Sequence, residues 1–148
     1  MSMTGQLTTV ESALEFTTAG NAYLTLRSTR TGTRYTYNVR RTRPHKDPPT
    51  FTVSVLSGPD TYRKVGFIDA GGLFRGQGFY AASPPVQAFL WYWDKLHCLQ
   101  QLPVDLEVWH DGACGVCGRQ LTVPESVERG IGPECALKMA MAGELEDW

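Results

Sequence analysis

Three cysteines near the C-terminal end of the chain have the spacing of metal ligands. Cys114 and Cys117 form a Cys-x2-Cys pair, and seventeen residues separate Cys117 from Cys135. A Cys-x2-Cys pair in a tight turn directs two thiolates toward one point, as tetrahedral zinc requires. His110 lies one short turn before the pair, with three residues between it and Cys114. The sequence therefore predicts a closed, structural Zn²⁺ site whose ligands are His110, Cys114, Cys117 and Cys135.

Two alternatives to this site remain open. Cys98 and His97 compete with His110 for the fourth position, although they occur in an apolar stretch, where a cysteine is commonly a small buried hydrophobe. A Cys-x2-Cys pair also serves thiol redox chemistry, but no βαβ pattern surrounds this pair. Three free or oxidised cysteines are the plain alternative to a metal site.

The chain in front of the cysteines has the alternation of antiparallel strands. Polar and apolar residues alternate over 22–28 and 34–41 around a turn with Gly32, which predicts a β-hairpin. Residues 51–55 and 62–68 continue it as a meander, and the proline-rich stretch 42–49 is expected to be a loop. A short helix capped by Thr9 is expected before the hairpin, and the glycine-rich stretch 71–80 after the meander is expected to form a turn or bulge.

One long helix is expected to cover the core face of this sheet. It begins at Ser83 with two prolines in its first turn, and apolar residues recur at helical spacing as far as His97. Residues 106–110 are predicted to form a strand that enters the cysteine turn, with 120–123 as its return, and a last helix begins at Pro133. The predicted fold is α+β. It combines an antiparallel β-meander covered by one amphipathic helix (1–103) with a zinc-knuckle or ribbon subdomain (104–148) that packs on it and ends in a short helix.

Charge is distributed unevenly, although the net charge is only −1. Residues 1–66 hold nine Lys/Arg and four Asp/Glu, whereas residues 67–148 hold five and eleven. Cations that could contact phosphates gather on the hairpin and the loop after it: Arg27, Arg30, Arg34, Arg40, Arg41, Arg43 and Lys46. Tyr23, Tyr35 and Tyr37 lie among them, and tyrosines can stack on unpaired bases. On strict alternation, however, tyrosines face away from Arg34 and Arg40, so that stacking and phosphate contact would not share one surface.

The segment Cys114-Gly-Val-Cys-Gly-Arg-Gln-Leu-Thr-Val-Pro-Glu-Ser-Val-Glu-Arg-Gly-Ile-Gly-Pro-Glu-Cys135 resembles a small zinc-ribbon-like domain family of unknown function. Its signature, CxxCGRxLTxPxSxxxGxGPxC, is met throughout. That family is known mainly from phage, prophage and actinobacterial proteins. The preceding Trp-His-Asp-Gly and an upstream region with T-G-T-R-Y-T-Y and V-S-V-L-S-G-P-D look like phage members and their companion N-terminal region. The resemblance implies a metal-binding phage or prophage accessory protein and supports His110 as a ligand, without implying an activity.

Three functions compete for this chain. The first is binding of DNA or RNA. The second is binding of a host protein complex, as an inhibitor of a defence system such as a CRISPR effector, with the acidic C-terminal half occupying a basic channel. The third, catalysis, is the weakest, because a site with four protein ligands leaves no open position for a substrate. We therefore expect a non-catalytic, phage-type accessory protein that binds nucleic acid or a nucleic-acid-handling complex, with the host-defence inhibitor as the alternative. The chain shows no apolar run long enough to span a bilayer and no signal peptide, so we expect a cytoplasmic protein without a membrane partner.

Overall fold

The structure is a computed structural model that describes residues 5–43, 48–98, 101–121 and 124–146. Its elements are β1 (Gly5–Leu7), α1 (Val10–Thr17), β2 (Asn21–Ser28), β3 (Arg34–Arg41), β4 (Phe51–Gly58), β5 (Thr61–Ile68), β6 (Phe74–Gly76), a 3-10 turn η1 (Gly78–Tyr80), α2 (Pro84–Cys98), β7 (Leu106–His110), α3 (Pro124–Arg129) and α4 (Pro133–Glu146). The strands described form one antiparallel sheet in the order β1-β7-β2-β3-β4-β5-β6. The α+β architecture with an antiparallel sheet is therefore confirmed.

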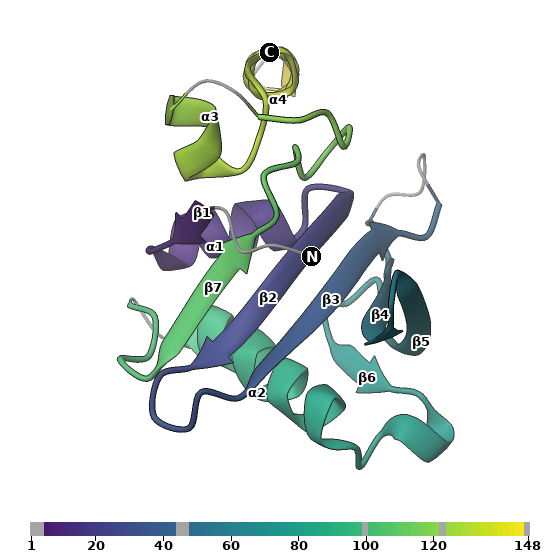
Figure 1. Ribbon diagram of the computed structural model, residues 1–148. Helices are drawn as coiled ribbons and strands as arrows, with labels where there is room; N and C mark the ends of the chain where they lie inside the picture. Colours follow the sequence, from purple (N-terminus) through teal and green to yellow (C-terminus); the bar gives the residue numbers. More distant parts are fainter. Residues whose placement is uncertain (1–4, 44–47, 99–100, 122–123, 147–148) are drawn as a thin grey trace.

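The sheet has one apolar face, which α2 covers. Strand alternation places Leu24, Tyr37 and Val53 on this face, and all three are fully buried. From α2, Phe89 meets Tyr37 with a ring-centroid distance of 5.1 Å. Figure 1 shows α2 passing behind β2 and β3, while no helix among the described residues crosses in front of these two strands. The core therefore lies between the sheet and α2, and the opposite face of β2 and β3 is open.

Helix α1 completes the core beside α2. Thr9 caps it, since its side-chain oxygen accepts a hydrogen bond from the Ser12 N–H, as predicted for this position. Its last turn joins α2 through a buried hydrogen bond of 2.8 Å between the hydroxyls of Thr17 and Tyr92. Because Thr17 donates its own proton to the Ala13 carbonyl, the Tyr92 hydroxyl is the donor in this pair.

Strands β4 and β5 bend away from the plane of β2 and β3 (Figure 1). Their pairing shifts register twice, between Val53 and Ser54 and between Leu56 and Gly58. An extra residue on one strand of a pair bends that strand and increases its twist. The open face of the sheet is therefore curved rather than flat.

The sheet departs from the prediction at its ends. Neither β1 nor β6 was predicted, because three residues are too few for a recognisable alternation. Strand β7 is confirmed, and it lies between β1 and β2 in the sheet. The return strand predicted at 120–123 is represented by a single bridge between Ala113 and Gln120, and residues 122–123 lie outside the described ranges. Within those ranges, no helix is long and apolar enough to cross a membrane.

Candidate metal centre

The turn that carries Cys114 and Cys117 is closed by backbone hydrogen bonds. The Cys114 N–H donates to the Arg119 carbonyl at 2.8 Å, and the Gly118 N–H donates back to the Cys114 carbonyl at 2.9 Å. Gly118 has a φ of +79°, a conformation that a residue with a Cβ adopts only at a cost. The glycine therefore allows the chain to reverse directly after Cys117, so that both thiols point to the same side.

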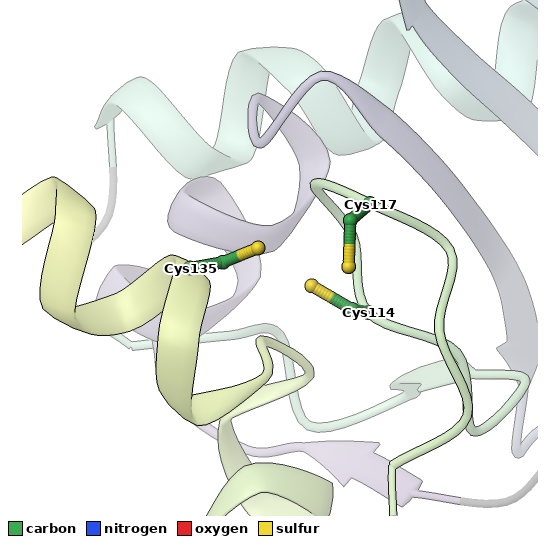
Figure 2. A group of neighbouring side chains, drawn as sticks. All are labelled: Cys114, Cys117 and Cys135. Atoms are coloured by element: carbon green, nitrogen blue, oxygen red, sulfur yellow. The ribbon is translucent and has the colours of Figure 1, made fainter.

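Cys135 brings the third sulfur from a different element. It lies in the first turn of α4, two residues after Pro133 begins that helix. Figure 2 shows the side chains of Cys114, Cys117 and Cys135 converging from the turn and from the helix. All three sulfur atoms lie within 4.8 Å of one another. Sulfurs of a tetrahedral zinc site lie about 3.8 Å apart for bonds of about 2.3 Å, so the spacing of these three thiols is compatible with a shared ion.

The surroundings favour a thiolate at Cys114. Its side chain is buried, and its sulfur accepts hydrogen bonds from the backbone N–H groups of Gly132, at 3.2 Å, and Val116, at 3.4 Å. Burial opposes ionisation, but the donors, which include the Cys117 N–H, outweigh it and lower the pKa of Cys114 to about 7. Burial and the two neighbouring thiols raise the pKa of Cys135 to about 12. Three thiolates therefore repel one another here unless a cation lies between them.

His110 does not join the three sulfurs in this arrangement. It is fully buried at the end of β7, and the group of possible ligand atoms contains the cysteines alone among the described residues. Its Nδ1 accepts a hydrogen bond from the Gly112 N–H at 2.9 Å, and its Nε2 is hydrogen-bonded to the Val127 carbonyl. Because Nδ1 is the acceptor, Nε2 carries the proton and donates to that carbonyl. The structure thus places His110 as a link between β7 and α3, and the predicted role as fourth ligand finds no support in this geometry.

The two competing residues also lie apart from the sulfurs. His97 is hydrogen-bonded through Nδ1 to the Trp93 carbonyl of its own helix, at 2.7 Å, and its ring lies against the Trp93 ring. Cys98 is exposed at the end of α2, and its sulfur does not belong to the group formed by Cys114, Cys117 and Cys135. Among the described residues, the ligand atoms that lie close enough to share one ion are therefore the three sulfurs.

The cysteine-bearing segment has a very small core of its own. Beyond Cys114, the buried apolar residues of this second cluster are Leu121 and Ile131, with Val127, Cys135 and Ala136 half-buried around them. Arg129 connects this segment to α1, because its guanidinium donates two hydrogen bonds, of 2.6 and 2.9 Å, to the carboxylate of Glu15. A cluster of this size buries too little apolar surface to order the segment without further cross-links.

A cavity of about 260 Å³ is lined in part by Cys117 and Cys135. Its wall includes Glu134 and Lys138 of α4, and Glu134 forms an exposed ion pair of 3.4 Å with Arg119. The cavity therefore adjoins two of the three cysteines. Sequence reasoning missed it, because residues 117–121 and 132–138 become neighbours only when α4 folds back on the turn.

The cations predicted to contact nucleic acid do not all share one surface. Arg27, Arg34 and Arg40 lie on the open face of the sheet, where Arg27 forms an ion pair of 2.7 Å with Glu107. Arg41 ends β3 and lines a hollow on that side, Arg30 lies in the turn before β3, and Arg43 follows β3. Lys46 lies outside the described residues. The structure adds Lys64, which pairs with Ser54 across β4 and β5 on the open face. Sequence alternation alone did not identify Lys64, because the register shift beside Val65 changes which residues of β5 face outward.

The fold and the cysteine triad define a class: a glycine-rich cysteine knuckle, of the kind that could hold a metal ion, attached to an antiparallel sheet. Residues 106–140 match a family described as a family of unknown function (DUF6011), and this match runs from β7 through the three cysteines into α4. The predicted resemblance to a family of unknown function is thereby confirmed for this part of the chain. No curated protein and no solved structure matches the chain.

Proposed function

We propose that the protein is a non-catalytic accessory module that binds nucleic acid on the open face of its sheet and is stabilised by a zinc ion held at Cys114, Cys117 and Cys135. The phage-type role implied by its C-terminal signature fits such a module.

The donor set supports zinc. Three thiolates are soft ligands, which favour zinc or an iron–sulfur cluster over magnesium or calcium. The N–H groups directed at Cys114 stabilise the negative sulfur that such an ion requires. A bound zinc would screen the repulsion among the three thiolates and fasten α4 to the turn.

The position of the triad supports a structural role for the ion. The sulfurs connect a turn and a helix whose shared core is small. Structural zinc contributes directly to folding, and its ligands commonly join segments that lack a sufficient core. Glu134, which lines the adjacent cavity, is paired with Arg119 and exposed, so it is poorly placed to act as a base beside the ion.

Nucleic-acid binding rests on one observation, the cations of the open face. Arg34, Arg40 and Lys64 are exposed there, and none of them forms an ion pair within the described part of the chain. Arg27, beside Arg34, is held by Glu107. Three unneutralised cations on one curved face create a positive surface, and polyanions are the partners that such a surface attracts.

Metal analysis tests the zinc part of the proposal. We expect about one zinc per chain, and we expect Cys117→Ser to lose the ion together with hydrogen-exchange protection in α3 and α4, because structural metal binding is coupled to folding. Cys98→Ser is the matched control, since Cys98 is the cysteine outside the triad and should keep the metal. Purified protein without metal, and with α4 still protected, would remove the zinc from the proposal.

Binding measured at several salt concentrations tests the nucleic-acid part. Contacts from three cations predict that the logarithm of the association constant falls with the logarithm of salt with a slope of about −2. Arg40→Gln should reduce that slope by about 1. Arg75→Gln is the control, because Arg75 is already paired with Asp69. If neither DNA nor RNA binds at low salt, the nucleic-acid part is refuted.

A further inference from the structure

Aromatic side chains from three strands lie on the same face as the cations, an arrangement that the alternation within any one strand does not reveal. Tyr35 and Tyr37 turn toward the core, as expected, but Tyr23 of β2, Tyr62 of β5 and Trp109 of β7 belong to the open side. All three are partly exposed. They are separated by up to 86 positions in the chain, from Tyr23 to Trp109. Only the sheet brings them together.

The curvature of the sheet places two of these rings in contact. Tyr23 and Tyr62 have ring centroids 5.4 Å apart with an interplanar angle of 71°. Strands β3 and β4 lie between their strands, so the rings meet only because β5 curls toward β2 over the open face. Burial, together with Tyr23, Asp111 and Asp60, raises the pKa of Tyr62 to about 12.

Trp109 extends the aromatic surface to the other side of β2. It pairs with Thr25, so it is a diagonal neighbour of Tyr23, which lies two residues earlier on the same strand. Its indole N–H is directed at Glu107 with a distance of 3.4 Å. The three rings therefore form a band across β5, β2 and β7.

A polar hollow of about 750 Å³ lies beside this band. It is lined by residues of β2, β3 and β4, among them Asn21, Asn38, Arg40, Thr52 and Ser54. Its volume is in the range of sites that bind small molecules or single nucleotides, roughly 300–1,000 Å³. Amides and hydroxyls there can bond to base edges or sugars, and Arg40 can contact a phosphate. The hollow thus offers both kinds of contact next to the aromatic band.

We propose, on the basis of the function proposed above, that this face binds single-stranded nucleic acid. Bases stack on Tyr23, Tyr62 and Trp109, while the backbone follows Arg34, Arg40 and Lys64. In a duplex the flat faces of the bases are already stacked on one another, whereas a single strand offers them to aromatic side chains. An acidic peptide would satisfy the cations but would leave the three rings unused, so the aromatic band favours the nucleic acid.

The test compares a single strand with its duplex. Fluorescence anisotropy is measured with oligonucleotides of about 15 nucleotides, as single-stranded DNA, single-stranded RNA and the matching DNA duplex. We expect either single strand to bind at least about tenfold more tightly than the duplex, and the two single-stranded arms show which sugar is preferred. Stacking contributes about five- to hundredfold per base in alanine-substitution experiments, so Tyr62→Leu and Trp109→Leu should each weaken single-strand binding by a factor in this range.

Two variants separate stacking from loss of structure. Tyr62→Phe keeps the ring and should keep most of the affinity. Trp91→Leu removes an exposed aromatic residue of α2, on the covered side of the sheet, and should leave binding unchanged. Equal binding of duplex and single strand, or equal loss in the Trp91 and Trp109 variants, overturns the single-strand inference while leaving nucleic-acid binding in place. If no oligonucleotide binds at low salt, both the single-strand inference and nucleic-acid binding are overturned. Binding of an acidic peptide but of no oligonucleotide has the same consequence.

Discussion

Replacing Gly130 with alanine is expected to loosen the cysteine-bearing segment from the sheet. Gly130 has a φ of +79°, and a left-handed conformation costs a residue with a Cβ about 1–2 kcal/mol. A Cβ at this position would lie 2.5 Å from Cδ1 of Phe16, whose ring is fully buried. Since the core holds that ring, the backbone of the segment must move, and overpacking of this kind costs about 1–3 kcal/mol. Alanine also lowers the entropy of the unfolded chain, which stabilises the folded state by about 0.4–1 kcal/mol. The expected net loss is about 1–4.5 kcal/mol.

Gly32→Ala is the matched control for this prediction. Gly32 has nearly the same φ, +76°, but a Cβ there meets no atom within 4 Å. Its cost should therefore be the conformational part alone, about 1 kcal/mol after the entropy of the unfolded chain is included. Urea denaturation of both variants gives the two free energies of unfolding, and the rate at which a chelator withdraws metal reports on the cysteine segment. Equal losses in the two variants, with equal metal release, would refute the argument that Gly130 is required for packing against Phe16.

Three further predictions follow from single contacts. His110→Ala should keep about one zinc per chain, as Cys98→Ala should, but should lower the free energy of unfolding by about 1–3 kcal/mol, because it leaves two half-buried backbone groups without their partner. Loss of zinc in the His110 variant alone would instead make His110 a ligand. Tyr92→Phe should cost about 0.5–1.5 kcal/mol in thermal or chemical denaturation, because the Thr17 hydroxyl loses its donor, and no loss would contradict that contact. The N–H groups of Leu73 and Gly71, with Arg75, hold the pKa of Asp69 below its ordinary value of 3.8, so the turn between β5 and β6 is stabilised above that value and loosens as the pH falls through the lowered pKa. Amide signals of this turn in an NMR titration should show the change, and Asp69→Asn should abolish it.

The local elements were predictable because their signals lie within a few residues of one another. The alternation over 22–28 and 34–41 led to the hairpin of β2 and β3, and Ser83 with two prolines marked the start of α2. Thr9 was equally predictable as a cap, because a capping side chain bonds to a backbone N–H in the first turn of the same helix. Strands β1 and β6 escaped prediction, because three residues do not establish a period.

The set of side chains that share the open face could not be predicted from local sequence patterns. Alternation correctly directed Tyr35 and Tyr37 away from Arg34 and Arg40, which made stacking and phosphate contact appear incompatible. The aromatic residues of that face come instead from strands that lie far apart in the chain. Their meeting depends on the position of β7 beside β2 and on the register shifts that curl β5, and neither has a signature in any short window of sequence.

The sequence by itself determined the sheet-forming hairpins, the long helix and the three cysteines as one group. Alternation, capping and the Cys-x2-Cys spacing act over one or two turns of chain, where covalent geometry leaves few choices. Only the tertiary structure decided the surroundings of His110 and the composition of the open face. A buried imidazole bonds to whichever polar groups the packing brings within reach, and here these are backbone groups of Gly112 and Val127. The aromatic band likewise depends on strand order and curvature, which result from how the whole sheet packs on α2.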